Sequence, residues 1–148
     1  MPPLPETKRL ALVKPTPQTH FYIDFDWWSQ SDRDWRVFLK SLLCLEHQQT
    51  IADLPEDLMI DWVDPVTAEV QRVDGIQHII ITHCARQPEF ITEHTTMVDA
   101  VFRLFLANGN TPMTPLEMAE RLGRSPDVIL KTLSGGRIYR GLRPRPEL

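Results

Sequence analysis

Residues 114–134 of the chain have the sequence TPLEMAERLGRSPDVILKTLS, and this stretch decides the fold of the last third. Thr114 suits a helix N-cap, the proline after it suits the first helical position, and Glu117 stands where a capping box requires it. Gly123 tolerates the left-handed backbone of a tight turn. The Ser-Pro pair that begins two residues later repeats the start signal. We therefore predict two short helices joined by a turn at Gly123.

The spacing of small and apolar residues in this stretch gives a second signal. Two helices that cross closely need a small residue where they touch, and Ala119 stands there, four residues before Gly123 and ten before Ile129. With this spacing, residues 115–134 resemble the helix-turn-helix family of DNA-binding domains. The resemblance implies that the second helix presents to a major groove the side chains of Asp127, Val128, Lys131 and Thr132. The sequence departs from the family pattern at Thr132, where an aliphatic residue is more usual.

An arginine-rich tail follows the second helix. Ser134 to Arg137 predict a turn, and Ile138 to Arg140 predict a short strand, which forms the wing in winged members of the same family. Guanidinium groups bind phosphate oxygens in a bidentate way, so we expect contacts with a nucleic-acid backbone. Few base-reading side chains occur in the second helix, so phosphate contacts should dominate. The basic residues assigned to this interface are Arg124, Lys131, Arg137, Arg140 and Arg143.

The net charge of −4 is unevenly distributed along the chain. Residues 19–99 contain five basic and fifteen acidic residues, whereas residues 124–148 contain six basic and two acidic ones. A basic C-terminal segment on an acidic protein favours a localised basic patch, which is typical of a surface that binds nucleic acid. The alternative is a short basic tail that is simply solvated.

The rest of the chain predicts a mixture of helices and one hairpin. We predict, in chain order, a strand at 21–25, an amphipathic helix at 34–47, a β-hairpin from 59–63 and 68–73, a helix at 75–86 and a core helix at 96–107. The isoleucines at 79–81 also fit a buried strand within 76–84, and periodicity alone does not decide between the two. The fold class is α+β, mainly helical.

Composition divides the chain into three parts. Residues 1–18 hold five of the thirteen prolines and predict an extended arm. Residues 19–90 predict a small acidic unit that combines a helix with the hairpin. Residues 91–148 predict the helix-turn-helix unit with its basic tail, which packs on the acidic unit through the core helix.

Two pairs of cysteine and histidine form a candidate zinc site. Cys44 and His47 are three residues apart, which places a thiolate and an imidazole on one helix face, and His83 with Cys84 offers two more ligands. Neighbouring residues of a helix point about 100° apart, so joint ligation by the second pair requires a non-helical backbone. The alternatives are buried apolar cysteines or a Cys–His nucleophile, and no orienting motif accompanies the latter.

Acidic and aromatic residues near the N-terminus offer two further candidates. Asp24 and Asp26 could serve a metal-dependent enzyme, with Asp61 and Asp64 as additional carboxylates, but alternate acids on a strand more often mark its solvent face. Trp27 and Trp28 are adjacent, so one of them should face outward in an extended chain and suit a homodimer contact. We do not expect an enzyme.

The composition narrows the remaining classes. No run approaches eighteen apolar residues, so we expect no membrane span, and the first residues lack the apolar core of a secretion signal. Two cysteines fit a reducing cytoplasm. The leading hypothesis is a cytoplasmic DNA-binding protein that regulates transcription. The alternatives are an adaptor that uses the helix-turn-helix to dock on another protein and a metal-dependent enzyme.

Overall fold

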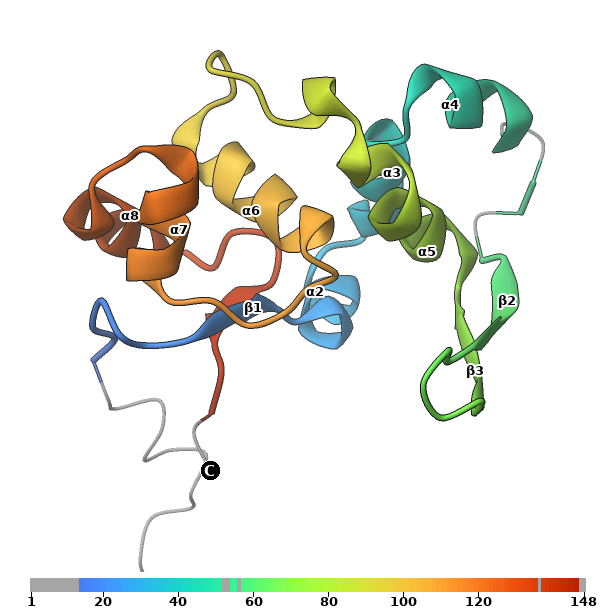
Figure 1. Cartoon of the computed structure of the whole chain (residues 1–148), viewed down its shortest axis with the longest axis horizontal. Helices are drawn as coiled ribbons and strands as arrows, with labels where there is room; N and C mark the ends of the chain where they lie inside the picture. The colour runs from blue at the N-terminus through green and yellow to red at the C-terminus, as the bar shows by residue number, and fades with distance from the viewer. Residues whose placement is uncertain (1–13, 52–53, 56, 136, 147–148) are drawn as a thin grey trace, which may run out of the picture.

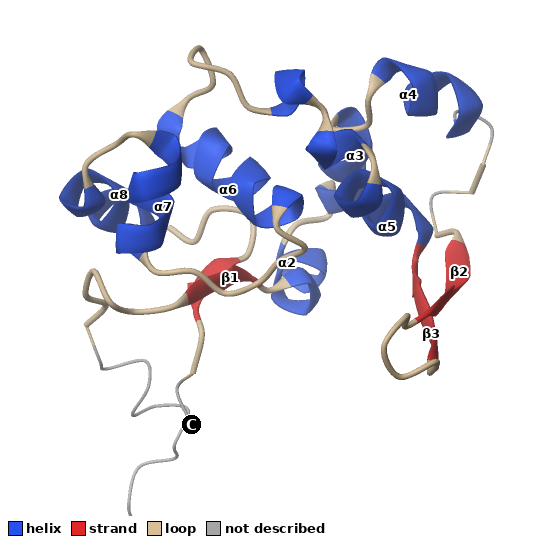
Figure 2. Cartoon of the chain, in the orientation of Figure 1, coloured by secondary structure: helices blue, strands red, loops and turns tan. Residues whose placement is uncertain are grey.

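A computed structural model of the protein describes residues 14–51, 54–55, 57–135 and 137–146. The predicted arm falls largely outside this range, at residues 1–13. The described elements are, in chain order, β1 (Phe21–Ile23), α2 (Phe25–Ser31), α3 (Trp35–Ser41), α4 (Leu45–Ile51), β2 (Met59–Val63), β3 (Val70–Asp74), α5 (Gly75–Thr82), η1 (Cys84–Arg86), η2 (Pro88–Phe90), α6 (Met97–Ala107), α7 (Pro115–Leu122), α8 (Pro126–Leu133) and β4 (Leu142–Pro144). The prediction of a mainly helical α+β protein is confirmed (Figure 2).

Helix α6 forms the centre of the hydrophobic core. Its six buried residues lie at positions 100–102 and 104–106, and they confirm the predicted core helix. Phe102 packs edge-on against Trp28 at 5.4 Å between ring centroids, and Phe38 packs against both rings. Burying one large apolar side chain is worth about 1.5–3 kcal/mol, so this aromatic cluster is a major source of stability. No helix in the described part of the chain is long and apolar enough to cross a membrane.

The two ends of the described chain meet in one small sheet. β1 pairs antiparallel with β4, so that Tyr22 lies opposite Arg143 (Figure 1). The predicted strand at 138–140 is wrong, because Arg140 and Gly141 have positive φ angles of 45° and 81° and turn the chain just before β4. A Cβ atom at Gly141 would lie 2.7 Å from the carbonyl oxygen of Asp24, so this crossing requires glycine. The last strand thus pairs across the whole chain and does not form a local wing hairpin.

The predicted helix at 34–47 is instead two helices with a break between them. α3 ends at Ser41 and α4 begins at Leu45. In the break, Leu42 and Leu43 are consecutive and both are buried, at 4% and 3% exposure. The backbone tightens here, because the N–H of Leu42 donates to the Leu39 carbonyl and the N–H of Leu43 donates to the Lys40 carbonyl, three residues back instead of four. The break brings Cys44 to the start of α4, where its carbonyl accepts a hydrogen bond from the N–H of Gln48.

The hairpin and the helix after it are confirmed, with one change at the end of the helix. β2 and β3 pair antiparallel, and the Asp74 carboxylate caps α5 by accepting a hydrogen bond from the N–H of Gln77. The stretch at 76–82 is therefore helical. α5 ends at Thr82 and not at residue 86, since His83 has φ −131° and ψ −64° and a separate 3-10 turn begins at Cys84.

Helices α7 and α8 follow the prediction closely. The capping box between Thr114 and Glu117 is formed in both directions, and Gly123 ends α7 with φ 64° and ψ 35°. Met118 and Ile129 are fully buried where the two helices meet α6. In Figure 1, α7 and α8 lie at one end of the molecule, and α4 with the hairpin lies at the other.

Candidate metal centre and helix-turn-helix surface

Three metal-ligand atoms from distant parts of the sequence converge at the junction of α4 and α5. Cys44 Sγ lies 3.2 Å from His47 Nδ1, and Cys84 Sγ lies 3.3 Å from Cys44 Sγ. Cys84 Sγ is also 3.5 Å from His47 Nδ1, which closes the triangle. We call these residues, together with His83, the thiol–imidazole cluster.

The local backbone explains how each ligand reaches the cluster. Cys44 precedes the first turn of α4, and His47 lies one turn further on the same face. On the other side, α5 ends just before His83, and Cys84 begins η1. Because His83 lies outside any helix, the direction of the chain changes between it and Cys84. The angle of about 100° between neighbouring side chains of a helix therefore does not prevent His83 and Cys84 from binding the same ion.

His83 lies at the edge of the cluster. Its ring packs edge-on against the His47 ring, with 4.5 Å between centroids. One ligand atom from each of Cys44, His47 and His83 falls within a 4.8 Å span, so these three residues could hold a metal ion. His83 Nε2 also lies 3.7 Å from the Glu46 carboxylate and 3.3 Å from the Gln87 side-chain nitrogen. Its side chain is 43% exposed, so His83 faces solvent at this edge.

The separations within the cluster suit a tetrahedral ion. Zinc–sulfur bonds of about 2.3 Å and zinc–nitrogen bonds of about 2.0–2.1 Å imply roughly 3.8 Å between two sulfurs and roughly 3.5 Å between sulfur and nitrogen. The triangle of Cys44, His47 and Cys84 has sides of 3.2, 3.3 and 3.5 Å. Small side-chain rotations therefore convert these contacts into ligand positions. When no ion is bound, the same contacts can be made as thiol–imidazole and thiol–thiol hydrogen bonds.

Burial makes Cys84 a poor thiolate without a cation. Its side chain is 1% exposed, and desolvation raises the pKa of its thiol from the ordinary value of 9.0 to about 11. The neighbouring Cys44 thiol adds to this shift. A positive ion at the cluster would stabilise the thiolate and offset the cost of burial.

Within the described residues, Cys44, His47 and His83 are the one group of three or more histidine, cysteine and acidic side chains placed to share an ion. Cys84 joins them through its contacts with Cys44 and His47. Asp24 instead caps α2 and pairs with Arg143, while Asp64 caps the hairpin loop by accepting a hydrogen bond from the N–H of Val66. Asp26 is exposed on α2, and Asp61 is exposed on β2. The candidate carboxylates for an enzyme thus lie on separate elements, and two of them have structural roles.

The residues predicted to face a major groove lie on the exposed side of α8. Asp127, Val128, Lys131 and Thr132 are all exposed, as is Arg124 in the turn before the helix. The Thr132 hydroxyl donates a hydrogen bond to the Val128 carbonyl at 2.8 Å, which occupies its one proton. The free face of α8 therefore carries one lysine, one aspartate and the nearby Arg124.

The three tail arginines have different environments. Arg137 is exposed. The guanidinium of Arg140 lies 3.4 Å above the Phe38 ring centroid, and its Nε is buried without a hydrogen-bond partner. Arg143 pairs with Asp24 at 3.0 Å and lies over the Trp27 ring. Two of the three predicted phosphate ligands are thus engaged with the protein's own aromatic and acidic residues.

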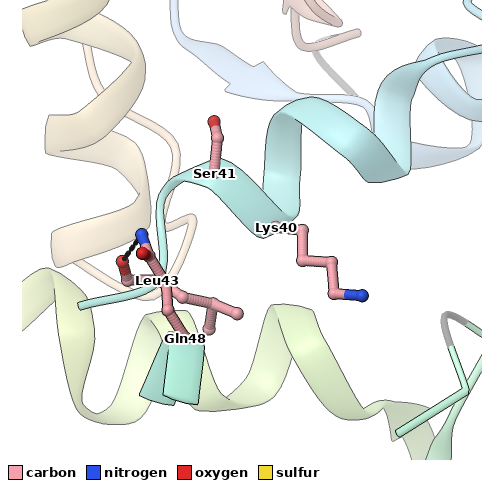
Figure 3. Close-up of a pocket in the computed structure, with 4 residues that line it drawn as sticks. All are labelled: Lys40, Ser41, Leu43 and Gln48. Carbon is pink, nitrogen blue, oxygen red and sulfur yellow. Dashed lines mark hydrogen bonds between the residues drawn. The ribbon is translucent and has the colours of Figure 1, made fainter. Parts of the chain in front are cut away.

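Sequence reasoning missed an open hollow where α3 ends and α4 begins. Its volume is about 470 Å³, and it is lined by Lys40, Ser41, Leu43 and Gln48 (Figure 3). The Gln48 side chain donates a hydrogen bond to the Leu43 carbonyl across this hollow, at 2.8 Å. The hollow exists because α3 and α4 are separate helices, and the predicted single helix at 34–47 left no place for it.

Comparison with protein-family models, with curated proteins and with solved structures found no match to this chain. The function must therefore be argued from the residues themselves.

Proposed function

We propose that this protein binds one zinc ion through Cys44, His47 and Cys84, with His83 as the fourth ligand. The observation that carries this proposal is the 3.3 Å separation between two cysteine sulfurs that lie forty residues apart in the sequence. Two thiolates and two imidazoles form a set that selects zinc over oxygen-seeking ions such as Mg²⁺ and Ca²⁺. Two free thiols at such a site require a reducing compartment, which favours the cytoplasm.

We assign the ion a structural role. Four protein ligands leave no open position for a substrate or an activated water, which catalytic zinc sites need. The ion would connect the start of α4 to the end of α5. Among its described residues, α4 has one fully buried side chain, Ile51, so a metal link would supply much of what holds this helix in place.

The proposal is tested by elemental analysis of protein purified under reducing conditions. We expect one zinc per chain, with loss of the metal in Cys44→Ser and in His47→Ala. His94→Ala is the matched control, because the His94 side chain is 89% exposed and outside the cluster. This variant should keep its zinc. Wild-type protein that neither retains zinc nor binds added zinc would overturn the proposal.

A second function, DNA binding through α7 and α8, is favoured by the form of that unit. The capping box, the left-handed Gly123 and the close packing of Ala119 support two well-formed helices that leave α8 exposed. Arg124 and Lys131 are exposed on its free side and are suited to phosphate contacts. In this proposal the protein is a transcription regulator, and the two engaged arginines of the tail are left out of the interface.

Binding to a mixed-sequence DNA duplex at low salt tests this second function. Replacing Arg124 and Lys131 together by alanine should weaken binding and lower the slope of log affinity against log salt by about two. The charge-matched control is Arg33→Ala with Arg72→Ala, two exposed arginines on other parts of the fold. An absence of binding by the folded wild type would contradict DNA binding and favour the docking of α7 and α8 on another protein.

A further inference from the structure

We propose that Cys44 and Cys84 also form a thiol redox couple, in which a hydroperoxide converts the two thiols of the metal-free protein into a disulfide. This couple would make zinc binding sensitive to oxidants, and that regulatory part rests on the zinc site proposed above. The disulfide itself follows from the positions of the two sulfurs and does not depend on the metal.

The geometry places the two sulfurs within reach of a bond. Cys44 Sγ and Cys84 Sγ are 3.3 Å apart, and a disulfide bond is about 2.05 Å long. The remaining movement of little more than an ångström is small for side chains at the ends of short elements. Cys44 lies at the start of α4, a helix held by a single fully buried residue, so local adjustment there is easy.

The two thiols differ in their access to an oxidant. Cys44 is partly exposed, whereas the side chain of Cys84 is 1% exposed. An oxidant from solvent therefore meets Cys44 first, and Cys84 is held behind it as the resolving thiol. This arrangement of an accessible cysteine beside a second one is typical of reversible oxidation sites.

The chemistry takes place in two balanced steps. The Cys44 sulfur attacks one peroxide oxygen, a sulfur–oxygen bond forms, and the oxygen–oxygen bond breaks. The leaving oxygen takes the proton of the Cys44 thiol and departs as an alcohol, or as water from hydrogen peroxide. The Cys84 sulfur then attacks the sulfur of Cys44. The disulfide bond forms, the sulfur–oxygen bond breaks, and the hydroxide leaves with the Cys84 proton as water. Two thiols and one hydroperoxide thus yield one disulfide, one alcohol and one water.

Zinc and the disulfide exclude each other, since both need the same two sulfurs. Oxidation removes both thiolate ligands and leaves only the two imidazoles. Two imidazoles bind zinc more weakly than two thiolates and two imidazoles together. Bound zinc in turn withholds the thiolates from the oxidant. At a free zinc concentration of 100 times the dissociation constant, about 1% of the protein is metal-free, so oxidation should slow about 100-fold.

The test treats full-length, metal-free protein with one equivalent of hydrogen peroxide and maps the products by mass spectrometry. We expect loss of both free thiols and one intramolecular peptide link between Cys44 and Cys84. The reaction should be faster in native buffer than in denaturant, where the two thiols are not held together. Sulfinic or sulfonic acid at Cys44 without a disulfide, or a link only between chains, would overturn the inference.

Two single variants show the order of the steps. Cys84→Ser should stop at the sulfenic acid of Cys44, which dimedone traps, and Cys44→Ser should be nearly inert because Cys84 is buried. Rapid dimedone labelling of Cys84 in Cys44→Ser would contradict the assigned order. If the disulfide forms but zinc does not bind, the zinc proposal and the exclusion fail while the thiol couple stands. If zinc binds but no disulfide forms, the thiol couple alone fails.

Discussion

At the scale of the residue, Arg140 shows that a run of basic residues in the sequence does not by itself identify a phosphate-binding surface. Its place in a basic tail predicted a phosphate ligand, but its guanidinium lies over the rings of Phe38 and Tyr139. The sequence carries no local mark of this contact, because Phe38 is about a hundred residues away. Arg143 is similar, since its partners Asp24 and Trp27 come from the other end of the chain.

Replacing Arg140 by alanine should therefore destabilise the fold. Loss of a cation–π contact costs about 0.5–2 kcal/mol, and the lost packing of the side-chain stem adds to this. Chemical denaturation measures the change in the free energy of unfolding. Arg137→Ala is the control, because an exposed residue of the same tail should change stability by less than about 0.5 kcal/mol. Equal effects of the two variants would contradict the internal role of Arg140.

Cys84 gives a prediction for the pH dependence of stability. Burial raises the pKa of its thiol to about 11 in the folded, metal-free protein, from an ordinary value of 9.0. Between these values the unfolded chain has lost the proton and the folded chain retains it. The free energy of unfolding therefore falls as pH rises from about 9 to 11. Denaturation of Cys84→Ser should show a shallower fall over this range, and an identical pH profile in both proteins would refute the assignment.

At the scale of the element, features that depend on neighbouring residues were predicted from the sequence, whereas features that depend on distant residues were not. The cap of α7 and the hairpin are confirmed, because short-range hydrogen bonds and turn residues determine them. The break between α3 and α4 was missed, because no glycine or proline marks it between residues 35 and 45. The strand β4 was misplaced, since its partner β1 is more than a hundred residues away. For the candidate metal site, the sequence indicated Cys44, His47 and His83 but not the end of α5 before His83, which helps to bring them together.

The two N-caps of the helix-turn-helix unit should differ in strength. The Thr114 side chain accepts a hydrogen bond from the N–H of Glu117, whereas Ser125 forms no such bond at the start of α8. We expect Thr114→Ala to cost about 1 kcal/mol, measured as a change in the free energy of unfolding. Ser125→Ala should cost clearly less. A larger loss at Ser125 would show that the caps are assigned wrongly.

At the scale of the whole molecule, the proposed functions lie at separate ends. The start of α4 and the end of α5, which carry the thiol–imidazole cluster, lie towards one end of the molecule, and α8 lies at the other, with α6 between them (Figure 1). The sheet of β1 and β4 joins the first and last described segments, so it crosses the division at residue 90 suggested by composition. The hydrophobic core is shared by the two ends of the molecule. The contacts of the thiol–imidazole cluster belong to one end, and the packing of α7 on α8 belongs to the other.

Removal of zinc should therefore loosen one end of the molecule only. Hydrogen exchange compared with and without a chelator should speed up in α4 and around residues 83–87. The amides of α7 and α8 should keep their protection, because these two helices pack on each other and on α6. Uniform loss of protection across the chain would show instead that the ion is needed for the whole fold.

X-ray absorption at the zinc edge of the purified protein is the sharpest test of the proposed zinc site. We expect a first shell of two sulfur atoms at about 2.3 Å and two nitrogen atoms at about 2.0–2.1 Å, with loss of one sulfur in Cys84→Ser. A shell made only of oxygen and nitrogen, or protein that holds no zinc, would contradict it.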